Sequence, residues 1–380
     1  MRQPLVYISI VAFGIILFSC NSNRKNPDDE SPTQKNAYAA GFEIQDSGEF
    51  TRLTVKNPWQ GAERVHFNYV LIPKGDEYNP PKEENVIHTP VERVVCLSTT
   101  HIAFIDALDK TETIVGISGS HFVSNPILRE RILQENLPDV GYDNHLNYEL
   151  ISSLNPDLVI AFGVGSNVAS YNQKLNEMGI PTVLVAEYLE ATPLGKTEWL
   201  KFFGALFEEE EKAEQWFNKV SENYQETKNR ASGIVNKPEV ITGLPWKGTW
   251  YVPGGHSFFA RMIEDAGGHY MWKENESRES IPLDIEAVFD RAQNADYWIN
   301  IGNVTKKSDI LEVDERMAQF NPYLLDNLYN YDKRMNRFGG NDFWETGVTR
   351  PDLVLKDLFK IFHPEKCPLD ELYFYRKIEE

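Results

Sequence analysis

One pattern occurs twice in the chain, and it constrains the fold more than any other feature. The copies span 148–163 and 285–302, with Glu149 and Glu286 at matching positions. Each copy predicts a short helix that begins beside its glutamate, a polar turn, and a strand that ends at glycine. Two similar α/β units predict two lobes, and a cleft between lobes is a common place for a ligand.

The start of the chain predicts export. Arg2 precedes an apolar run over 5–18, shorter than the roughly 20 residues that span a membrane, so a cleavable signal is expected over 1–19. The cleavage region 17–20 resembles that of a bacterial lipoprotein, although Phe18 is bulkier than the usual residue. Cys20 would then be the lipidated first residue, with an ordinary signal peptide as the alternative. The polar stretch 20–41 predicts a flexible tether.

The net charge narrows the function classes. The formal charge is −19, and loss of Arg2 with the signal makes it about −20, which argues against binding of nucleic acid or anionic lipid. The chain has three cysteines. Cys96 lies in an apolar run and is expected to be a buried small residue. A disulfide between Cys96 and Cys367 is disfavoured because the two lie in different predicted lobes.

The pattern of apolar residues divides the rest of the chain. Residues 42–73 alternate in the manner of antiparallel strands, and 74–90 form a predicted loop, so 42–90 is a β extension. Strand–helix–strand rhythm then predicts a parallel α/β lobe over 91–192 and a second over 236–380. The expected strands are 91–98, 113–118, 157–163, 182–187, 239–244 and 297–302, with a helix near 258–266 stopped by Gly267-Gly268.

The segment 193–235 carries the longest helical pattern. Its apolar residues recur every three or four positions and form one stripe, weakened at Gly204 and interrupted near 208–211. Two arrangements stay open: two helices with a break near 208–211, or one rigid helix joining the lobes. The expected architecture is therefore two parallel-sheet α/β lobes joined by a long connecting α-helix, with an N-terminal antiparallel β extension.

These features resemble a known family, the substrate-binding proteins of bacterial ABC importers that take up ferric siderophores, haem or cobalamin. The resemblance covers 91–365. It depends on the segments 93–98, 155–160 and 254–258, on Gly267-Gly268, and most specifically on 349–358 followed by His363-Pro364-Glu365. It implies a periplasmic, lipid-anchored, monomeric binding protein with no cofactor of its own. The implied partners are a permease with its ATPase, a metal-complex ligand, and the membrane through the lipid anchor.

The resemblance assigns Glu149 and Glu286 a role, because in the family one surface glutamate per lobe docks with arginines of the permease. Two charges fixed on two lobes suit electrostatic docking. The alternative is that each glutamate only favours the N-terminus of its helix, and both roles can hold together.

The ligand site is predicted from strand ends, since open α/β sheets bind ligands beyond the carboxyl ends of their strands. Aromatic rings with a few polar tips suit a large planar or amphipathic ligand. The candidates follow predicted strands or precede conspicuous motifs: Thr99, Thr100 (also a candidate helix cap), His101, His145, Phe162, Trp246, Trp250, Tyr251, Phe343 and Trp344.

Histidines are candidate ligands of a haem iron or a cobalt, namely His101, His121, His145 and His256. The competing interpretation for each is an ordinary hydrogen-bonding or exposed residue. Packing competes in the same way for Trp246, Trp250 and Tyr251. For Arg350, a structural ion pair is favoured over contact with a ligand carboxylate.

Other functions find less support. The histidines are scattered without HxH or HExxH spacing, so no bare-metal site is expected. Gly195-Lys196-Thr197 lacks the upstream glycine of a phosphate loop, because position 190 is glutamate. No catalytic residue is assigned. The alternatives kept are a surface lipoprotein that passes ligand to an outer-membrane receptor and, least favoured, an enzyme acting in the cleft.

Overall fold

The computed structural model describes residues 33–76, 78, 84–142, 145–163, 168–367 and 371–380. The predicted signal segment and Cys20 lie outside these residues. Among the described residues, no helix is both long and apolar enough to cross a membrane.

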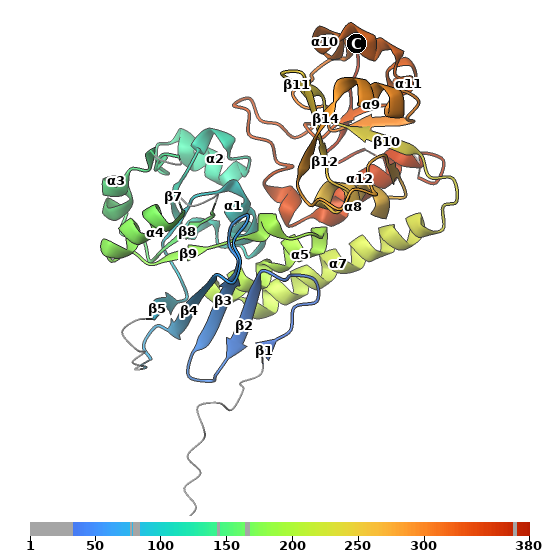
Figure 1. Ribbon diagram of the computed structural model, residues 1–380. Helices are drawn as coiled ribbons and strands as arrows, with labels where there is room; N and C mark the ends of the chain where they lie inside the picture. The colour runs from blue at the N-terminus through green and yellow to red at the C-terminus, as the bar shows by residue number, and fades with distance from the viewer. Residues whose placement is uncertain (1–32, 77, 79–83, 143–144, 164–167, 368–370) are drawn as a thin grey trace, which may run out of the picture. The chain divides into compact units, whose positions relative to one another are not determined.

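The N-terminal extension is a five-stranded sheet in sequential order (Figure 1). Its strands are β1 (Thr33–Gln34), β2 (Phe42–Asp46), β3 (Thr51–Lys56), β4 (His66–Pro73) and β5 (Asn85–Thr89). The antiparallel strands predicted over 42–73 are confirmed. The predicted loop over 74–90 hides one more strand, β5, which pairs with β4 in parallel. The sequence 85–89 is too short to stand out from the prolines before it.

The first lobe is built on a four-stranded parallel sheet in the order β7-β6-β8-β9. Its strands are β6 (Val94–Cys96), β7 (Ile114–Ile117), β8 (Leu158–Ala161) and β9 (Thr182–Leu184). Its helices are α1 (Thr99–Ala107), α2 (Pro126–Leu133), α3 (Tyr148–Ser153) and α4 (Val168–Glu177). Nearly every residue of these strands is buried, as the apolar runs predict for a sheet covered on both faces.

The second lobe repeats this plan with a five-stranded sheet in the order β13-β10-β15-β16-β17. These strands are β10 (Glu239–Thr242), β13 (His269–Tyr270), β15 (Tyr297–Ile299), β16 (Leu328–Asn330) and β17 (Arg376–Lys377). A smaller sheet contains β11 (Pro245–Trp246), β12 (Thr249–Pro253) and β14 (Ser280–Asp284). The helices are α8 (Phe258–Asp265), α9 (Ile285–Ala292), α10 (Lys307–Val313), α11 (Asn321–Leu324) and α12 (Pro351–Phe362). The two predicted repeats correspond to α3 followed by β8 and to α9 followed by β15.

The connecting segment contains α5 (Pro193–Glu198), α6 (Leu200–Phe207) and α7 (Glu210–Ser232), the long yellow-green helix of Figure 1. The helix is interrupted at Glu208, whose φ of 54° is left-handed. Of the two arrangements predicted, separate helices with a break near 208–211 are therefore the observed one. Gly204 permits a close turn-back, because a Cβ there would lie 2.8 Å from the Cβ of Ala213 on α7. The 23 residues of α7 span about 35 Å and pack against α12.

The core explains why α6 is almost entirely apolar, with Lys201 as its one charged residue. All eight of its residues are buried, between the first lobe and the inner face of the β extension. Trp199, which precedes α6, packs against Phe42 of β2 with ring centroids 4.8 Å apart. A second large cluster fills the other lobe. Cys96 is buried as predicted, and both Cys96 and Cys367 are free thiols.

The structure corrects the predicted tether at its C-terminal end. Thr33–Gln34 pairs with β2, and the backbone N–H groups of 37–41 donate to the buried carboxylates of Glu190 and Glu198. Residues 33–41 are therefore held against the body of the protein. Composition alone could not reveal these contacts, because both carboxylates lie about 150 residues further along the chain.

Candidate functional site

A cavity of about 360 Å³ lies where the carboxyl ends of strands from both lobes meet. This is the place that open α/β sheets offer to a ligand. The first lobe lines it after β6, β7 and β8, and the second lobe after β15 and β16. The lining residues are Leu97, Ser98, Thr99, Ser118, Phe122, Tyr142, Phe162, Gly302, Asn303, Tyr331, Asp332, Met335, Gly339, Asn341 and Trp344.

The first-lobe wall is shaped by tight turns. Ser98 is the cap of α1, where its side chain accepts the N–H of Thr100. The cap predicted at Thr100 is therefore misplaced by two residues. Gly141 is required in the turn before His145, because its φ is 86° and a Cβ would lie 2.2 Å from the His145 carbonyl oxygen.

Asp139 joins the two turns that carry Phe122 and Tyr142. Its carboxylate accepts the N–H groups of Gly119 (3.2 Å), Ser120 (2.7 Å) and Gly141 (3.0 Å). Desolvation acts to raise the pKa of Asp139, but these hydrogen bonds outweigh it and the pKa lies below its ordinary value. The charged carboxylate thus holds together the two turns from which Phe122 and Tyr142 line the cavity.

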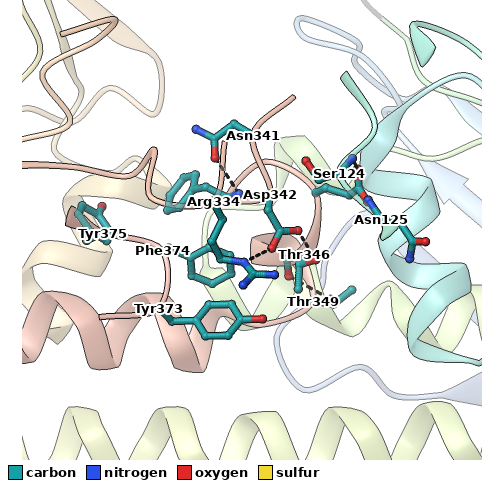
Figure 2. A network of polar contacts seen from close by, with 12 residues as sticks. Ser124, Asn125, Arg334, Asn341, Asp342, Thr346, Thr349, Tyr373, Phe374 and Tyr375 are labelled. Carbon is teal, nitrogen blue, oxygen red and sulfur yellow. Dashed lines mark hydrogen bonds and ion pairs between the residues drawn. The ribbon is translucent and has the colours of Figure 1, made fainter. Parts of the chain in front are cut away.

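The second-lobe wall is an aromatic stack. The ring of Tyr331 lies against Phe343, with centroids 4.6 Å apart, and meets Trp344 edge-on at 5.3 Å. Phe343 is buried behind this pair, whereas Trp344 is 48% exposed. Phe343 and Trp344 follow Asp342 directly in the chain. Figure 2 shows how this loop is held, since Asp342 accepts hydrogen bonds from Arg334 and Thr346. Trp344 therefore reaches the cavity from a loop held by hydrogen bonds, and Tyr331 reaches it from the end of β16.

The loop that bears Trp344 also bonds directly to the first lobe. The Glu345 carboxylate accepts the N–H groups of Ser124 and Asn125, each at 2.7 Å, and Asn336 Nδ2 donates to the Val123 carbonyl at 2.8 Å. Burial raises the pKa of Glu345 to about 8. The two walls of the cavity are therefore tied together at one side.

The structure brings three of the predicted ligand-binding residues to the cavity, namely Thr99, Phe162 and Trp344. Thr100 lies one position beyond the lining. Phe343 is 4% exposed and supports the wall from behind. His101 is fully buried between Phe162 and Phe203, and burial lowers its pKa to about 3, so the ring is neutral. Their roles in ligand binding stay predictions.

Four other candidates lie away from the cavity. Trp250 was expected at the cleft but is fully buried, because alternation along β12 turns it into the core, where Nε1 donates to the Thr242 carbonyl. Trp246 and Tyr251 are exposed on the small sheet. His145 is exposed and does not line the cavity.

The remaining polar candidates, two histidines and one arginine, also lie outside the cavity lining. His121 and His256 are exposed and do not line the cavity. Arg350 makes a two-pronged ion pair with Asp352, with both N–O distances 2.9 Å, which is the favoured structural interpretation. Among the described residues, no group of three or more His, Cys, Asp or Glu side chains could hold a metal ion.

Sequence reasoning missed most of the second-lobe wall. Tyr331, Asp332 and Met335 follow β16, a strand of three residues whose sequence Leu-Tyr-Asn gives little strand signal. Phe122 and Tyr142 lie in turns that were noted only for their polar residues. Since ligands of open α/β sheets bind beyond the carboxyl ends of the strands, the aromatic residues that follow every strand, the shortest included, are candidates.

The two matching glutamates both lie in the first turn of an exposed helix. Glu149 follows the cap Asn147 of α3, and Glu286 follows the cap Asp284 of α9. Glu286 also pairs with Arg316 at 2.6 Å, although its side chain is 72% exposed. Among the described residues, Glu149 has no ion-pair partner. Both positions are compatible with docking and with stabilisation of the helix N-terminus.

Comparison with known proteins agrees with this geometry. The family model described as periplasmic binding protein matches residues 94–322, more than half of the chain. An uncharacterized lipoprotein of Methanocaldococcus jannaschii is 27% identical over 301 residues, covering 77% of this chain and 70% of the relative. A second from the same organism is 27% identical over 332 residues, covering 84% and 82%.

Solved structures share the fold. A periplasmic heme-binding protein from Pseudomonas aeruginosa superimposes with a TM-score of 0.59 at 16% identity, covering 76% of this chain and 99% of that one. A periplasmic solute-binding protein from Veillonella parvula gives 0.58 at 20% identity, covering 75% and 85%. Because the family model covers more than half of its length, the chain belongs to the periplasmic binding protein family.

Proposed function

We propose that this protein captures a metal complex, namely a ferric siderophore, haem or cobalamin, and presents it to the permease of an ABC importer. The observation that carries the proposal is the cavity between the lobes, which receives Phe122 and Phe162 from one lobe and Tyr331 and Trp344 from the other. Rings converging from two walls suit a large flat or amphipathic ligand.

Similar proteins support the choice of ligand class. Structures of the same fold include the heme-binding protein from Pseudomonas aeruginosa and a protein of an Fe³⁺-hydroxamate transport system from Saccharomonospora viridis. The cavity volume of about 360 Å³ lies at the lower end of the range for small-molecule sites. A large complex would therefore extend from the cavity toward solvent.

Attachment to a membrane through Cys20 is part of the proposal. The relatives named lipoproteins support it. The anchor would keep the binding protein close to its permease and raise the effective concentration of the pair. A Cys20→Ser variant tests this point, because it should pass from the detergent phase to the aqueous phase in a Triton X-114 partition of whole cells.

A visible absorption titration of the purified mature protein tests the ligand. Haemin, cyanocobalamin and the ferric hydroxamate ferrichrome are all coloured, and one of them should bind saturably, measured as visible absorbance that stays with the protein after gel filtration. The same titration with Trp344→Ala should need more ligand to saturate. If a folded sample responded to none of the three, the proposal of a metal complex would be overturned.

A further inference from the structure

One carboxylate oxygen of Asp332 lacks a hydrogen-bond donor within the described part of the protein. The residue follows β16 and lines the cavity, and its side chain is only 10% exposed. Oδ2 accepts a hydrogen bond from Arg376 at 2.7 Å. Oδ1 is buried, and no described residue of the protein donates a hydrogen bond to it. A buried acceptor without a hydrogen-bond partner costs free energy. A ligand that donates a hydrogen bond to Oδ1 would remove this cost, so the contact would stabilise the complex.

The ion pair with Arg376 leaves little room for that arginine to bind a ligand. Its other contacts are to the Thr305 carbonyl at 3.2 Å and the Val304 carbonyl at 3.4 Å. Arg376 itself does not line the cavity. The guanidinium therefore balances the Asp332 charge from behind the wall, while Oδ1 remains as the acceptor.

The rest of the lining offers no positive charge. Asp332 is the one charged side chain among the described lining residues, and the other polar ones are hydroxyls and amides, such as Ser98, Thr99 and Asn303. A ligand with several negative charges would lose its hydration here without gaining a cation.

Two arginines near the edge of this region, Arg129 and Arg337, are already engaged in other contacts. Arg129 and Arg337 both lie over the ring of Phe338, at 4.4 and 4.7 Å from its centroid. Arg129 also donates to the Ser120 carbonyl at 2.7 Å. Neither lines the cavity. Their positions favour packing against Phe338 over direct recognition of an anion within the cavity.

We propose that the cavity selects a metal complex without net negative charge, and that the bound complex donates a hydrogen bond to Asp332 Oδ1. This inference rests on the proposed function and sharpens it. A neutral ferric trihydroxamate or cobalamin, or a complex with a pendant ammonium, meets both conditions through its N–H groups. Haemin, with two carboxylates, and a trianionic ferric catecholate meet the first condition poorly.

Competition binding on the mature protein tests the charge preference. The probes are ferrichrome and cyanocobalamin (neutral), ferrioxamine B (with an ammonium), haemin, and ferric enterobactin (trianionic). Quenching of tryptophan fluorescence reports binding, because Trp344 lines the cavity. At least one neutral or cationic probe should bind about tenfold or more tightly than either anionic probe, and the ratio should persist in high salt.

Asp332→Asn tests the contact itself and is expected to lower the affinity for the preferred probe about tenfold. Asp265→Asn is the matched control, since Asp265 lies in the same lobe, is 12% exposed, and pairs with Lys228 at 2.9 Å, away from the cavity. Equal affinities of the two variants would remove Asp332 from recognition. Tighter binding of haemin or enterobactin would overturn the charge preference and leave the proposed function standing. Binding of no probe by folded protein would overturn both.

Discussion

The carboxylate of Glu345 accepts the backbone N–H of Asn125 at 2.7 Å, across the interface between the two lobes. The second oxygen accepts the N–H of Ser124 at the same distance. Figure 2 shows Ser124 and Asn125 beside the loop that carries Asp342 and Thr346. The Glu345 carboxyl group accepts both N–H groups at the start of α2, so its charge state is coupled to the contact between the lobes.

Stability should therefore depend on pH through Glu345. Burial raises its pKa from 4.5 to about 8, and Asp342 and Asp106 act in the same direction against the two N–H donors. Between these values the folded state holds a proton that the unfolded state has released. The contribution of Glu345 to the unfolding free energy is thus largest below pH 4.5 and is lost as the pH rises to 8, by up to about 1.4 kcal/mol per pH unit.

Chemical denaturation of the wild type and of Glu345→Gln between pH 5 and 8.5 measures this contribution. The difference in unfolding free energy should move in favour of the variant as the pH rises, since glutamine has no charge to bury. The pH-independent part of the difference reports the hydrogen bond lost where the amide nitrogen faces a backbone donor. A difference that stays constant with pH would show that Glu345 titrates normally.

Two tryptophans with similar exposure should differ in their effect on ligand binding. Trp344 is 48% exposed and lines the cavity, whereas Trp246 is 63% exposed and lies on the small sheet. Trp344→Ala should weaken binding of the metal complex about tenfold, because it removes a ring from the site. Trp246→Ala should leave affinity unchanged. Isothermal titration calorimetry of both variants gives the comparison, and equal losses would contradict the assignment of the cavity.

The sequence predicts the scaffold of the site better than its surface. Strands β6 and β8 are runs of buried apolar residues, so their carboxyl ends could be located, and with them Thr99 and Phe162. Strand β16 has three residues, one of them an asparagine, and a run that short gives no reliable period. Because β16 could not be predicted, Tyr331 and Asp332, which follow it, could not be predicted as site residues either.

Aromatic residues in one short segment can have opposite fates. Trp246, Trp250 and Tyr251 looked equivalent in the sequence because all follow β10. In a strand, successive side chains point to opposite faces, so β12 buries Trp250 and exposes Tyr251. Which face is the core depends on Trp298 and Phe320, which pack on Trp250 from distant parts of the chain. Contacts of that kind, like those of Glu345 with Ser124, cannot be read from local pattern.

Removal of both matching glutamates should separate binding from transport. The variant Glu149→Ala with Glu286→Ala should bind its metal complex with wild-type affinity, since neither residue lines the cavity. Uptake of the complex by cells should nevertheless fall strongly, because two fixed charges are lost from the expected docking surface. The measurement is uptake of radiolabelled complex, with affinity measured on the purified variant.

The ion pair of Glu286 supplies the control for this experiment. Arg316 holds Glu286 at 2.6 Å and also contacts Asp314 at 2.6 Å. Arg316→Ala frees the Glu286 carboxylate without removing it, so uptake should be maintained. Normal uptake by the double alanine variant would assign the two glutamates to their helix N-termini alone.

The segment before the β extension should depend on one buried carboxylate. Glu198 is fully buried and accepts the N–H groups of Ala37, Tyr38 and Ala39 at 2.9, 2.7 and 2.8 Å. Glutamine offers only one acceptor oxygen, so Glu198→Gln leaves at least one of these donors unpaired. We expect a loss of about 1–3 kcal/mol in unfolding free energy, together with faster proteolytic cleavage within 33–41.

Thermal unfolding and limited proteolysis with mass spectrometry measure the two effects. Lys201 forms ion pairs with both Glu198, at 3.3 Å, and Glu214, at 2.8 Å. Glu214→Gln is therefore the control, because it removes a partner of Lys201 whose side chain is 43% exposed. The control should lose at most about 1 kcal/mol, as exposed ion pairs do, and its N-terminal segment should stay protected. If both variants were cleaved at the same rate, Lys201 rather than the buried carboxylate would hold the segment in place.

Protection that is lost only in Glu198→Gln would mean that the body of the protein begins near residue 33. That boundary fixes how much chain is left to act as a tether.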